Sequence, residues 1–319
     1  MADFGYTLMC EQAGPTQLVD DAVRAERIGF DFAVISDHYN PWLPEQGHSP
    51  YAWSVLGAVA YATSRMDLVS FVTSPIRRYH PAVVAQKAAT VGVMSEGRFT
   101  LGLGAGENLN EHVVGSWPHV RQRHDMLVEA LEIIRLLLAG QTVHYGGEYF
   151  EVPEARLWDL PEEEVPMALA VSGPASCELA GEYTDAMIAI EPKAELIRMF
   201  DEAGGSGRPR YAQVPLCYGE DEARCRKLAH AQWRWAGVPW SVNAELPEPR
   251  SFAAVSQSRT EDEIARLVPC GPDVDRHVQA VRTYLDAGFT HVALVQVGAG
   301  EQDAFLDFAE RELLPALRD

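Results

Sequence analysis

Short runs of apolar residues alternate along the chain with longer segments in which apolar residues recur every three or four positions. The short runs are typical of buried strands, and the longer segments are typical of amphipathic helices. The pattern predicts eight strands, at residues 4–10, 32–36, 68–73, 99–103, 167–171, 186–190, 210–217 and 291–297. It predicts helices at residues 15–28, 50–63, 81–94, 119–138, 175–181, 193–203, 221–235, 260–267, 273–287 and 302–314.

Eight strands that alternate with helices over 319 residues predict one domain, a parallel (β/α)8 barrel that spans residues 1–319. Two insertions interrupt the alternation. Residues 143–152, with Gly146 and Gly147 at their centre, predict a β-hairpin in an insertion near 141–153. Residues 238–258 hold three prolines and no clear period, so we expect an inserted loop there. The alternative fold is an open doubly wound sheet, which normally has a glycine-rich turn after its first strand.

Composition excludes several classes of protein. Hydrophobic residues make up 47% of the chain, enough for a large core, and the formal net charge of −20 disfavours binding to nucleic acids and to anionic membranes. The sequence has no apolar run of membrane-spanning length and no charged-then-apolar signal at its start. Its five cysteines are widely spaced, which favours a reducing cytoplasm with free thiols.

The working residues of a (β/α)8 barrel lie at the C-terminal ends of its strands. The polar residues that follow the predicted strands are therefore candidates for chemistry: Glu11, Asp37, His38, Ser74, Glu107, Ser172, Glu191 and Lys193. His38 is the natural proton carrier among them, because an imidazole titrates near neutral pH. Glu107 follows a loop of small residues, Gly104 to Gly106, that lets the backbone approach a flat ligand closely.

Other motifs are less specific. The turn from Ser172 to Ala175 leads into a helix, and its free N–H groups are suited to hold a phosphate. No histidine pair or Cys/His cluster has metal-ligand spacing, so we expect no metal site. A serine hydrolase is unsupported, since the G-x-S-x-G elbow is absent. Trp233, Trp235 and Trp240 lie close in sequence and form either the packing of a lid or an apolar wall for the substrate.

The motif residues resemble a known family. The stretch from Ser36 to Trp42 (SDHYNPW) and the stretch from Gly104 to Glu111 (GAGENLNE) are similar to the two signature stretches of deazaflavin-dependent oxidoreductases in the luciferase-like superfamily. Residues 81–86 (PAVVAQ) also match, and the resemblance runs from Phe4 to about Leu317. This superfamily includes the F420-dependent glucose-6-phosphate dehydrogenases. The resemblance implies a (β/α)8 barrel, coenzyme F420 as the hydride carrier and a homodimer.

The resemblance also assigns roles position by position. It implies a catalytic group made of His38, Glu107, Trp42 and Glu11. It implies that the deazaflavin contacts Asp37, Phe71, Val72, Ser74, Ala105, Gly106 and Asn110, and that Ser172, Gly173, Ala175 and Ser176 hold its phosphate and tail. A non-proline cis peptide bond, a feature of the family, is expected between Phe71 and Val72.

The substrate positions depart from the pattern of the sugar-phosphate dehydrogenases, which hold the phosphate with two lysines and an arginine. Only Lys193 has a counterpart here, and Ile190 stands where a threonine would touch the sugar. One ammonium group is a poor substitute for three cations around a dianion. We therefore expect a less charged, more apolar alcohol or carbonyl compound. The anionic cofactor must be held by backbone donors and a few cations such as Lys193, Arg77 or Arg78.

The leading hypothesis is a cytoplasmic oxidoreductase that moves a hydride between a substrate carbon and C5 of the deazaflavin. In oxidation, we assign the hydroxyl proton to His38 and the proton near ring atom N1 to Glu107, although the reverse assignment is nearly as plausible. Trp42 would cap the substrate, and Glu11 would orient a proton carrier. Two alternatives stay open: a flavin mononucleotide-dependent monooxygenase of the same superfamily, and a non-catalytic protein that stores or delivers the deazaflavin.

Overall fold

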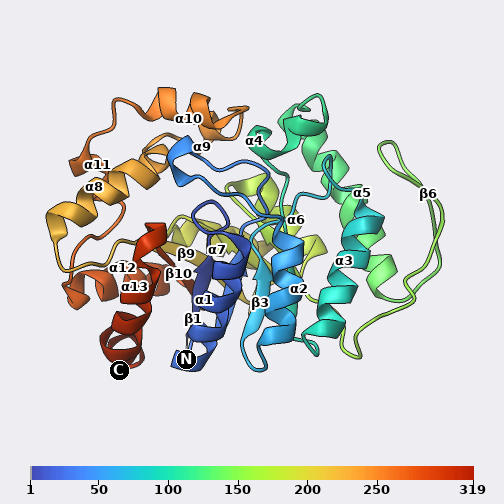
Figure 1. Ribbon diagram of the computed structural model, residues 1–319. Coiled ribbons are helices and arrows are strands. Elements are labelled where there is room, and N and C mark those ends of the chain that lie inside the picture. The colour runs from blue at the N-terminus through green and yellow to red at the C-terminus, as the bar shows by residue number, and fades with distance from the viewer. Residues whose placement is uncertain (1) are drawn as a thin grey trace.

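The computed structural model describes residues 2–319 and contains a closed barrel of parallel strands surrounded by helices (Figure 1). The order of strands around the barrel is β1-β10-β9-β8-β7-β4-β3-β2. Their bounds are β1 (Asp3–Leu8), β2 (Phe32–Ile35), β3 (Asp67–Ser70), β4 (Phe99–Leu103), β7 (Met167–Ala170), β8 (Ala186–Ala189), β9 (Arg210–Leu216) and β10 (His291–Gln296). The closed order confirms the predicted (β/α)8 fold and excludes the open doubly wound sheet.

Helices cover the outside of the barrel and lie along its upper end. The outer helices are α1 (Pro15–Ile28), α2 (Ala52–Ala62), α3 (Pro81–Met94), α5 (Val120–Leu138), α6 (Pro174–Tyr183), α7 (Ala194–Phe200), α8 (Glu222–Trp233), α12 (Val274–Ala287), α13 (Gln302–Phe308) and α14 (Leu314–Arg318). The short helices at the C-terminal ends of the strands are α4 (Asn108–Glu111), α9 (Trp240–Asn243), α10 (Pro249–Ser256) and α11 (Glu261–Ile264). In Figure 1 these short helices lie above the barrel, and both termini lie below it.

Local sequence explains the ends of the best-predicted helices. Pro15 stands at the first position of α1, where the missing N–H costs nothing, and Gly29 ends the helix with φ of 99°. Pro81 begins α3 in the same way, and the preceding His80 accepts a hydrogen bond from the N–H of Ala82. Because these prolines and this glycine mark helix ends in the sequence, both helices match the predicted bounds.

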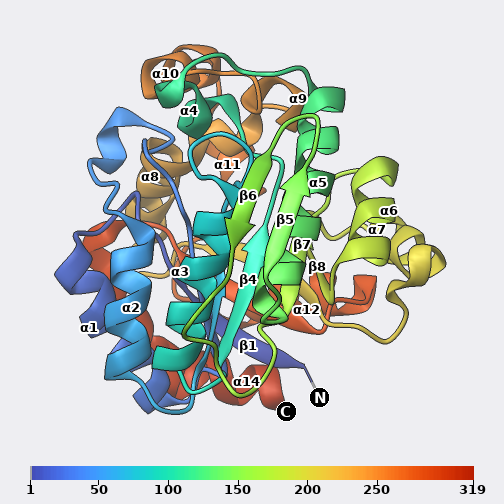
Figure 2. The same ribbon diagram turned by 90° about the vertical axis from the view of Figure 1, so that its right-hand side faces the viewer.

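The two insertions differ from each other. Residues 143–155 form the predicted hairpin, with β5 (Val143–Gly146) antiparallel to β6 (Glu151–Ala155). Figure 2 shows this hairpin along the outside of the molecule beside α5. The prediction of a loop at 238–258 is wrong in part, because α9 and α10 lie within it. These helices are too short for a visible period and are held by tertiary contacts, such as the fully buried side chain of Phe252.

The interior of the barrel is filled at its lower end and open at its upper end. Apolar side chains that point inward from neighbouring strands, among them Phe32, Val69, Ala168 and Tyr211, form a closed cluster inside the barrel. Phe32 packs against the rings of Tyr211 and His291. A ligand can therefore enter only at the C-terminal ends of the strands. No helix within residues 2–319 is long and apolar enough to cross a membrane.

Candidate active site

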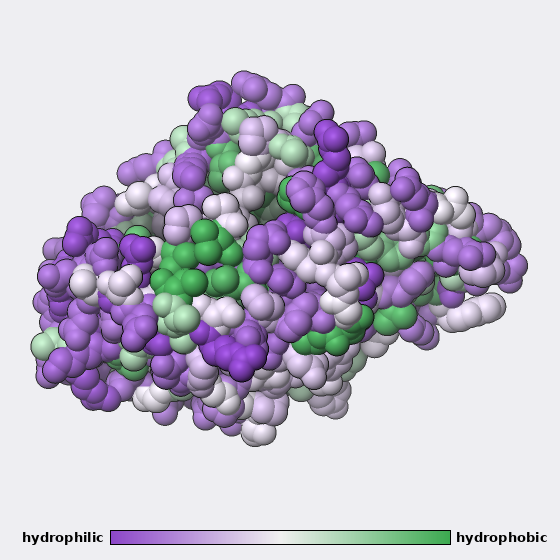
Figure 3. Space-filling model, turned by 90° about the horizontal axis from the view of Figure 1, so that it is seen from above, coloured by the Kyte–Doolittle hydropathy of each residue, from purple (hydrophilic) through white to green (hydrophobic). Residues whose placement is uncertain are grey.

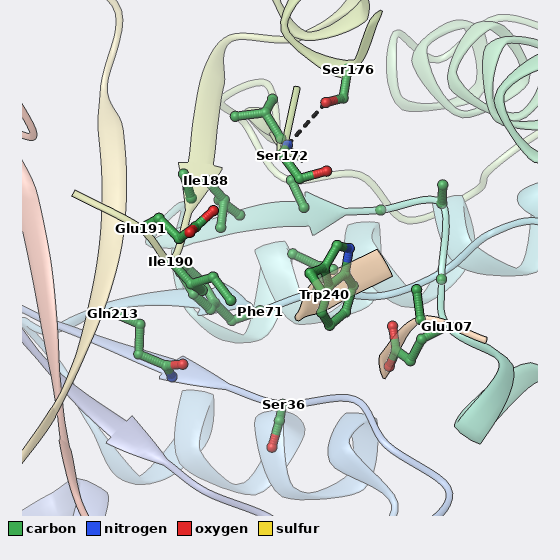
Figure 4. A pocket seen from close by; sticks show the side chains of 18 of the residues that line it. Ser36, Phe71, Glu107, Ser172, Ser176, Ile188, Ile190, Glu191, Gln213 and Trp240 are labelled. Atoms are coloured by element: carbon green, nitrogen blue, oxygen red, sulfur yellow. Dashed lines mark hydrogen bonds between the residues drawn. The ribbon is translucent and has the colours of Figure 1, made fainter. Parts of the chain in front are cut away.

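A cavity of about 280 Å³ opens at the C-terminal ends of the strands. The connections that follow β1, β2, β3, β4, β7 and β8 all contribute to its lining. The lining includes Thr7, Met9, Glu11, Ser36, His38, Trp42, Phe71, Val72, Gly104, Ala105, Gly106, Glu107, Arg123, Ser172, Ser176, Ile190, Glu191, Gln213, Trp233, Trp235, Trp240 and Ala244. Figure 4 shows Glu107 on one side of this cavity, with Ile190 and Glu191 on the other. Seen from above in Figure 3, the surrounding surface is mostly hydrophilic, with separate hydrophobic areas.

An imidazole between two carboxylates is the chemical centre of the cavity. Atom Nδ1 of His38 lies 2.6 Å from Oε1 of Glu11, and Nε2 lies 3.2 Å from Oε1 of Glu107. Glu11 is 1% exposed and also accepts a hydrogen bond of 2.8 Å from the hydroxyl of Ser36. Asn110 donates to Oε1 of Glu107 over 2.5 Å. The structure thus brings the three predicted proton-handling residues into one continuous row.

The electrostatics of this row favour a charged imidazole. Burial opposes the charge on His38, but the carboxylates of Glu11 and Glu107 outweigh it and raise the pKa of His38 above its ordinary value of 6.5. Burial likewise works to raise the pKa of Glu11, but the charge of His38 and the hydrogen bonds from His38 and Ser36 lower it below 4.5. Glu11 and His38 therefore form a buried ion pair whose imidazole can give a proton toward the cavity.

A second group of charged residues lies directly behind the row. Arg78 donates to the backbone oxygen of Asp37 over 2.6 Å and contacts the Asp37 carboxylate at 3.2 Å and that of Glu111 at 3.4 Å. Asp37 also accepts hydrogen bonds from Trp53, Thr73 and Tyr79, over 3.1, 2.8 and 3.2 Å respectively. Arg78, which follows β3, therefore joins the connection after β2, which carries His38, to the connection after β4, which carries Glu107.

Tryptophans form an apolar wall above the imidazole. Trp42 stacks on Trp235 with ring centroids 4.2 Å apart and planes 10° apart, and it packs against His38 with ring centroids 4.8 Å apart and planes at 70°. Trp233 lies against Trp235 at 5.2 Å, and Trp240 lies 6.4 Å from Trp42. All four indoles line the cavity. Of the two interpretations of the tryptophans at 233–240, the wall is the one that this geometry favours.

The floor of the cavity is backbone with small side chains. The peptide bond between Phe71 and Val72 is cis, as expected. A Cβ atom added at Gly104 would lie 2.8 Å from Cγ2 of Val72, and one added at Gly106 would lie 2.7 Å from Oγ of Ser74. Gly106 also has φ of 72°, which L-residues rarely adopt. Ala105 lines the cavity between them. The two glycines therefore let this loop pack tightly against Val72 and Ser74, so that its backbone lines the cavity.

The turn before α6 differs from the expectation. The N–H groups of Ser172 and Gly173 donate to Oγ of Ser176 over 3.0 and 3.2 Å, so they are not free to bind a phosphate in this arrangement (Figure 4). Ser176 is the third residue of α6, and its hydroxyl reaches back to these two N–H groups and caps the start of the helix. The N–H groups of Ala175 and Ser176, in the first turn of α6, are the ones that have no intrahelical acceptor.

Several predicted residues do not line the cavity. Asp37, Ser74 and Asn110 are buried behind it, where they support the loops that do. Asn110 accepts from the N–H groups of Tyr39 and Asn40, which ties the two signature stretches together. Gly173 and Ala175 flank the lining residues of the α6 turn.

Lys193 is the clearest departure from the predicted substrate site. It does not line the cavity, and its ammonium group pairs with Glu191 at 2.9 Å on the exposed side of the connection after β8. The neighbouring Ile190 does line the cavity and is 52% exposed. Arg78 is likewise committed, since Asp37 and Glu111 surround its guanidinium. Lys193 and Arg78, two of the three cations expected to neutralise an anionic ligand, are thus paired within the protein.

The sequence analysis missed lining residues that do not directly follow a strand. Thr7, Met9 and Gln213 point inward from β1, the connection after it, and β9. Arg123 lines the cavity from the first turn of α5 and is 4% exposed. It had a detectable signal, because position 123 lies on the same helical face as Met126, Leu127 and Ala130, and an arginine on an apolar face is rarely free. Within residues 2–319, no group of His, Cys, Asp and Glu is arranged to hold a metal ion.

Comparisons with known proteins agree with this geometry. The family model for luciferase-like monooxygenases matches residues 2–291. The chain is 36% identical to the F420-dependent glucose-6-phosphate dehydrogenase of Microbacterium testaceum, covering 99% of this chain and 97% of that protein. It is 35% identical to the protein of the same name from Nakamurella multipartita, covering 99% and 96%.

Two solved structures are similar to the whole chain. An F420-dependent secondary alcohol dehydrogenase in complex with an F420-acetone adduct superposes with a TM-score of 0.91 at 29% identity, covering 100% of this chain and 99% of the other. The coenzyme F420-dependent tetrahydromethanopterin reductase of Methanopyrus kandleri superposes with a TM-score of 0.79 at 22% identity, covering 99% of each chain, and bears on the fold alone.

Proposed function

The chain belongs to the luciferase-like monooxygenase family, and from this premise we propose that it is an F420-dependent oxidoreductase that interconverts a small uncharged alcohol and its carbonyl compound. The class of enzyme and the cofactor follow from full-length relatives and from a structural neighbour that depend on F420. The observation that carries the choice of chemistry is the row of Glu11, His38 and Glu107 at the rim of an apolar cavity.

The cavity fits the cofactor. Its floor, from the Phe71–Val72 bond to Gly104, Ala105 and Gly106, consists mainly of backbone and small side chains, which suits a flat ring. The hydroxyl of Ser74 beneath the floor is buried and has no hydrogen-bond partner within the described chain, so a polar atom of the bound cofactor can pair with it. When bound, the deazaflavin supplies the carbon that accepts or gives the hydride, and the protein supplies orientation, proton transfer and the exclusion of water.

The three residues of the row have different roles in proton transfer. His38 exchanges the proton of the substrate oxygen, because its ring packs against Trp42 at the apolar end of the cavity. Glu11 holds Nδ1 of this imidazole and stabilises its charge. Glu107, oriented by Asn110, handles the proton on the cofactor side. In the direction of carbonyl reduction, the charged imidazole is the acid that protonates the developing alkoxide.

The walls of the cavity favour an uncharged substrate. Trp42, Trp233, Trp235 and Trp240 give an apolar enclosure near His38. Lys193 is paired with Glu191 outside this enclosure. A sugar phosphate would need several cations around its dianion, and the apolar end of the cavity provides indole rings instead.

A titration with a substrate panel tests the proposal. Apoprotein is titrated with F420 and with flavin mononucleotide, and the F420 complex is then screened against secondary alcohols, ketones and glucose 6-phosphate by cofactor absorbance. We expect F420 to bind, and uncharged alcohols to bleach it faster than glucose 6-phosphate. Tight flavin binding with oxygen uptake would instead favour a monooxygenase. Tight F420 binding without bleaching by any compound would favour a storage protein.

We also propose that two copies associate through the outer faces of α2 and α3. The exposed residues of these helices carry no charge, although the chain has a net charge of −20: Ser54, Ala58, Tyr61, Ala62, Val83, Gln86, Thr90, Val93 and Met94. An uncharged face is where two such acidic molecules can meet with the least repulsion. Sedimentation equilibrium should give a dimer, and Val93→Asp should give a monomer. A wild-type monomer at micromolar concentration would contradict this.

A further inference from the structure

Two buried cysteines lie opposite each other where a long segment leaves the barrel and returns to it. Cys217 directly follows β9, and Cys270 forms an isolated parallel bridge with it. The N–H of Cys217 donates to the oxygen of Pro269 over 2.9 Å, and the N–H of Gly271 donates to the oxygen of Cys217 over 3.0 Å. This pattern makes the two cysteines direct neighbours across the bridge, with their side chains on the same side.

The separation of this pair suits a disulfide bond. Paired strands lie about 4.8 Å apart. Disulfides join residues whose Cα atoms are about 4.4–6.8 Å apart. A hydrogen bond already joins the thiols of Cys217 and Cys270, so the two sulfur atoms approach each other in the reduced protein. The backbone therefore needs no rearrangement of the bridge for the two sulfurs to be linked.

The surroundings of Cys270 favour its thiolate. A hydrogen bond from Cys217 lowers the pKa of Cys270, and the charges of Arg226 and Arg276 lower this pKa further. Burial and the carboxylate of Glu222 act in the opposite direction and are outweighed. The other four cysteines have raised pKa values, because they are buried and, for Cys217, because its thiol donates to Cys270. Since the thiolate is the reactive form, Cys270 is the nucleophile of the pair and Cys217 is its partner.

The pair stands at the base of the segment that carries most of the tryptophan wall. Residues 218–269, which we call the wall segment, contain α8, α9, α10 and α11. Figure 1 shows α8, α10 and α11 together at the upper end of the barrel. Trp233, Trp235 and Trp240 line the cavity from this segment. A covalent bond between Cys217 and Cys270 would close the whole wall segment into a loop.

Burial limits which reagents can reach the pair. Cys217 and Cys270 are 0% and 1% exposed. Their bridge is isolated, and Gly271 directly after it has φ of 102°. A single bridge opens more readily than a ladder of paired strands, so small molecules can enter by local opening. These conditions select a small oxidant, such as a hydroperoxide, over a bulky disulfide such as oxidised glutathione.

We propose that Cys217 and Cys270 are an oxidation site, at which hydrogen peroxide converts the two thiols into a disulfide that fastens the base of the wall segment. The thiolate of Cys270 attacks one oxygen of the peroxide, the O–O bond breaks, and hydroxide leaves and recovers from solvent the proton that Cys270 had released. The sulfur of Cys217 then attacks the resulting sulfenic acid. The S–S bond forms, the S–O bond breaks, and water leaves with the thiol proton of Cys217. One peroxide is reduced by two electrons and two thiols are oxidised.

Mapping of the thiols after oxidation tests the site. Reduced wild-type protein is treated with hydrogen peroxide, the remaining thiols are alkylated in denaturant, and the peptides are identified by mass spectrometry. We expect the loss of two alkylated cysteines and a cross-linked peptide that joins Cys217 to Cys270, which dithiothreitol reverses. Alkylation of all five cysteines, under conditions that fully oxidise free glutathione, would overturn the proposal. A cross-link of Cys217 to Cys225 instead would also overturn it.

Single substitutions separate the roles of the two thiols. Cys270→Ser should slow the oxidation of Cys217 by about 10-fold or more, because it removes the nucleophile. Cys217→Ser should leave Cys270 as a sulfenic acid, which dimedone traps. Cys225→Ala should form the same disulfide as the wild type. Cys177→Ala, which changes another buried cysteine, is the matched control and should oxidise as the wild type does. Equal rates of Cys217 oxidation in the wild type and in Cys270→Ser would refute the assignment of Cys270.

Hydrogen exchange tests the consequence of the bond. Amide exchange is followed by mass spectrometry in the reduced and the oxidised wild type, with β1 and β2 as the internal reference. We expect the disulfide to slow exchange in the wall segment by about 3-fold or more. Unchanged exchange would show that the bond does not fasten the segment. If a serine variant does not fold, as judged by circular dichroism, the mapping and the exchange in the wild type decide. None of these measurements uses F420 or a substrate, so they are independent of the proposed function.

Discussion

The two halves of the barrel mouth are built differently. In the half that follows β1 to β4, the polar side chains are buried and bonded to one another: Glu11, Asn110 and Glu111 are each 1% exposed, and Asp37 is 2% exposed. In the half that follows β7 to β9, Glu191 and Lys193 have side chains that are 50% and 55% exposed and that pair only with each other.

The difference teaches where precision is needed. Proton transfer requires donor and acceptor atoms to stay within hydrogen-bond reach, so the half that carries His38 and Glu107 is locked by a second layer around Arg78. The connections after β7 and β8 line the cavity with small or exposed groups, such as Ser172 and Ile190, whose replacement would leave the row of Glu11, His38 and Glu107 in place.

The largest expected effect comes from removing the proton carriers of the half that follows β1 to β4, which we call the bonded half. His38→Ala and Glu107→Gln should each lower the turnover of F420 with the best alcohol by about 100-fold or more, because general acid–base catalysis contributes about that much. Cofactor affinity should change little. Turnover is read from F420 absorbance, and the dissociation constant from its fluorescence.

The matched change in the half that follows β7 to β9, which we call the open half, is Glu191→Gln. This substitution should alter turnover by less than about 3-fold. If Glu191→Gln lowers turnover as much as Glu107→Gln, the division of the mouth into a chemical half and a variable half is wrong. Wild-type turnover in both His38→Ala and Glu107→Gln would remove the proposed mechanism altogether.

The second test breaks the layer behind the row. Arg78→Met leaves the carboxylates of Asp37 and Glu111 buried without their cation, which should lower the free energy of unfolding by about 3–5 kcal/mol. Urea unfolding followed by tryptophan fluorescence measures the change. The conservative Arg78→Lys should recover part of it. A loss below about 1 kcal/mol for Arg78→Met would mean that the buried pairs do not hold the loops together.

A third test uses pH. Burial raises the pKa of Glu111 from 4.5 to about 7, against the opposing charge of Arg78. The folded state therefore binds more protons than the unfolded state between these values, so this residue makes the free energy of unfolding fall as pH rises from about 4.5 to 7. Glu111→Gln should show a flatter pH dependence in that window. Equal slopes for the two proteins would show that Glu111 ionises normally.

The smallest effect is expected in the open half. Lys193→Ala should change the free energy of unfolding by less than about 0.5 kcal/mol, since exposed ion pairs contribute little. It should also leave kcat/KM for an uncharged alcohol within about 3-fold. A loss of 10-fold or more would place Lys193 at the substrate and restore the role that the sequence resemblance implied.

The same division marks what the sequence could predict. The half that follows β1 to β4 contains short contiguous motifs directly after strands. SDHYNPW and GAGENLNE therefore predicted that His38 and Glu107 lie at the cavity, whereas Asp37 and Asn110 of the same motifs are buried behind it. The barrel itself was predictable because prolines and glycines such as Pro15, Gly29 and Pro81 begin and end its helices at fixed points. These signals consist of residues that are neighbours in the chain, so they can be recognised in a single sequence.

What the sequence could not predict depends on contacts between distant segments. The pairing of Lys193 with Glu191 removes a cation that its position alone seemed to offer, and no periodicity reveals it. The helices at 240–243 and 249–256 form on a tertiary surface that the sequence pattern does not display. The Arg123–Glu245 pair joins residues 122 positions apart. Each of these outcomes is decided by packing rather than by spacing.

The stacked indoles of Trp42 and Trp235 have a practical consequence. Two parallel chromophores 4.2 Å apart couple electronically, so the protein carries an optical label at the rim of its own cavity. The near-ultraviolet circular dichroism of this pair should report any displacement of the wall as a ligand enters. Entry and turnover can thus be timed separately in the unmodified protein, without a dye and without waiting for the cofactor to change colour.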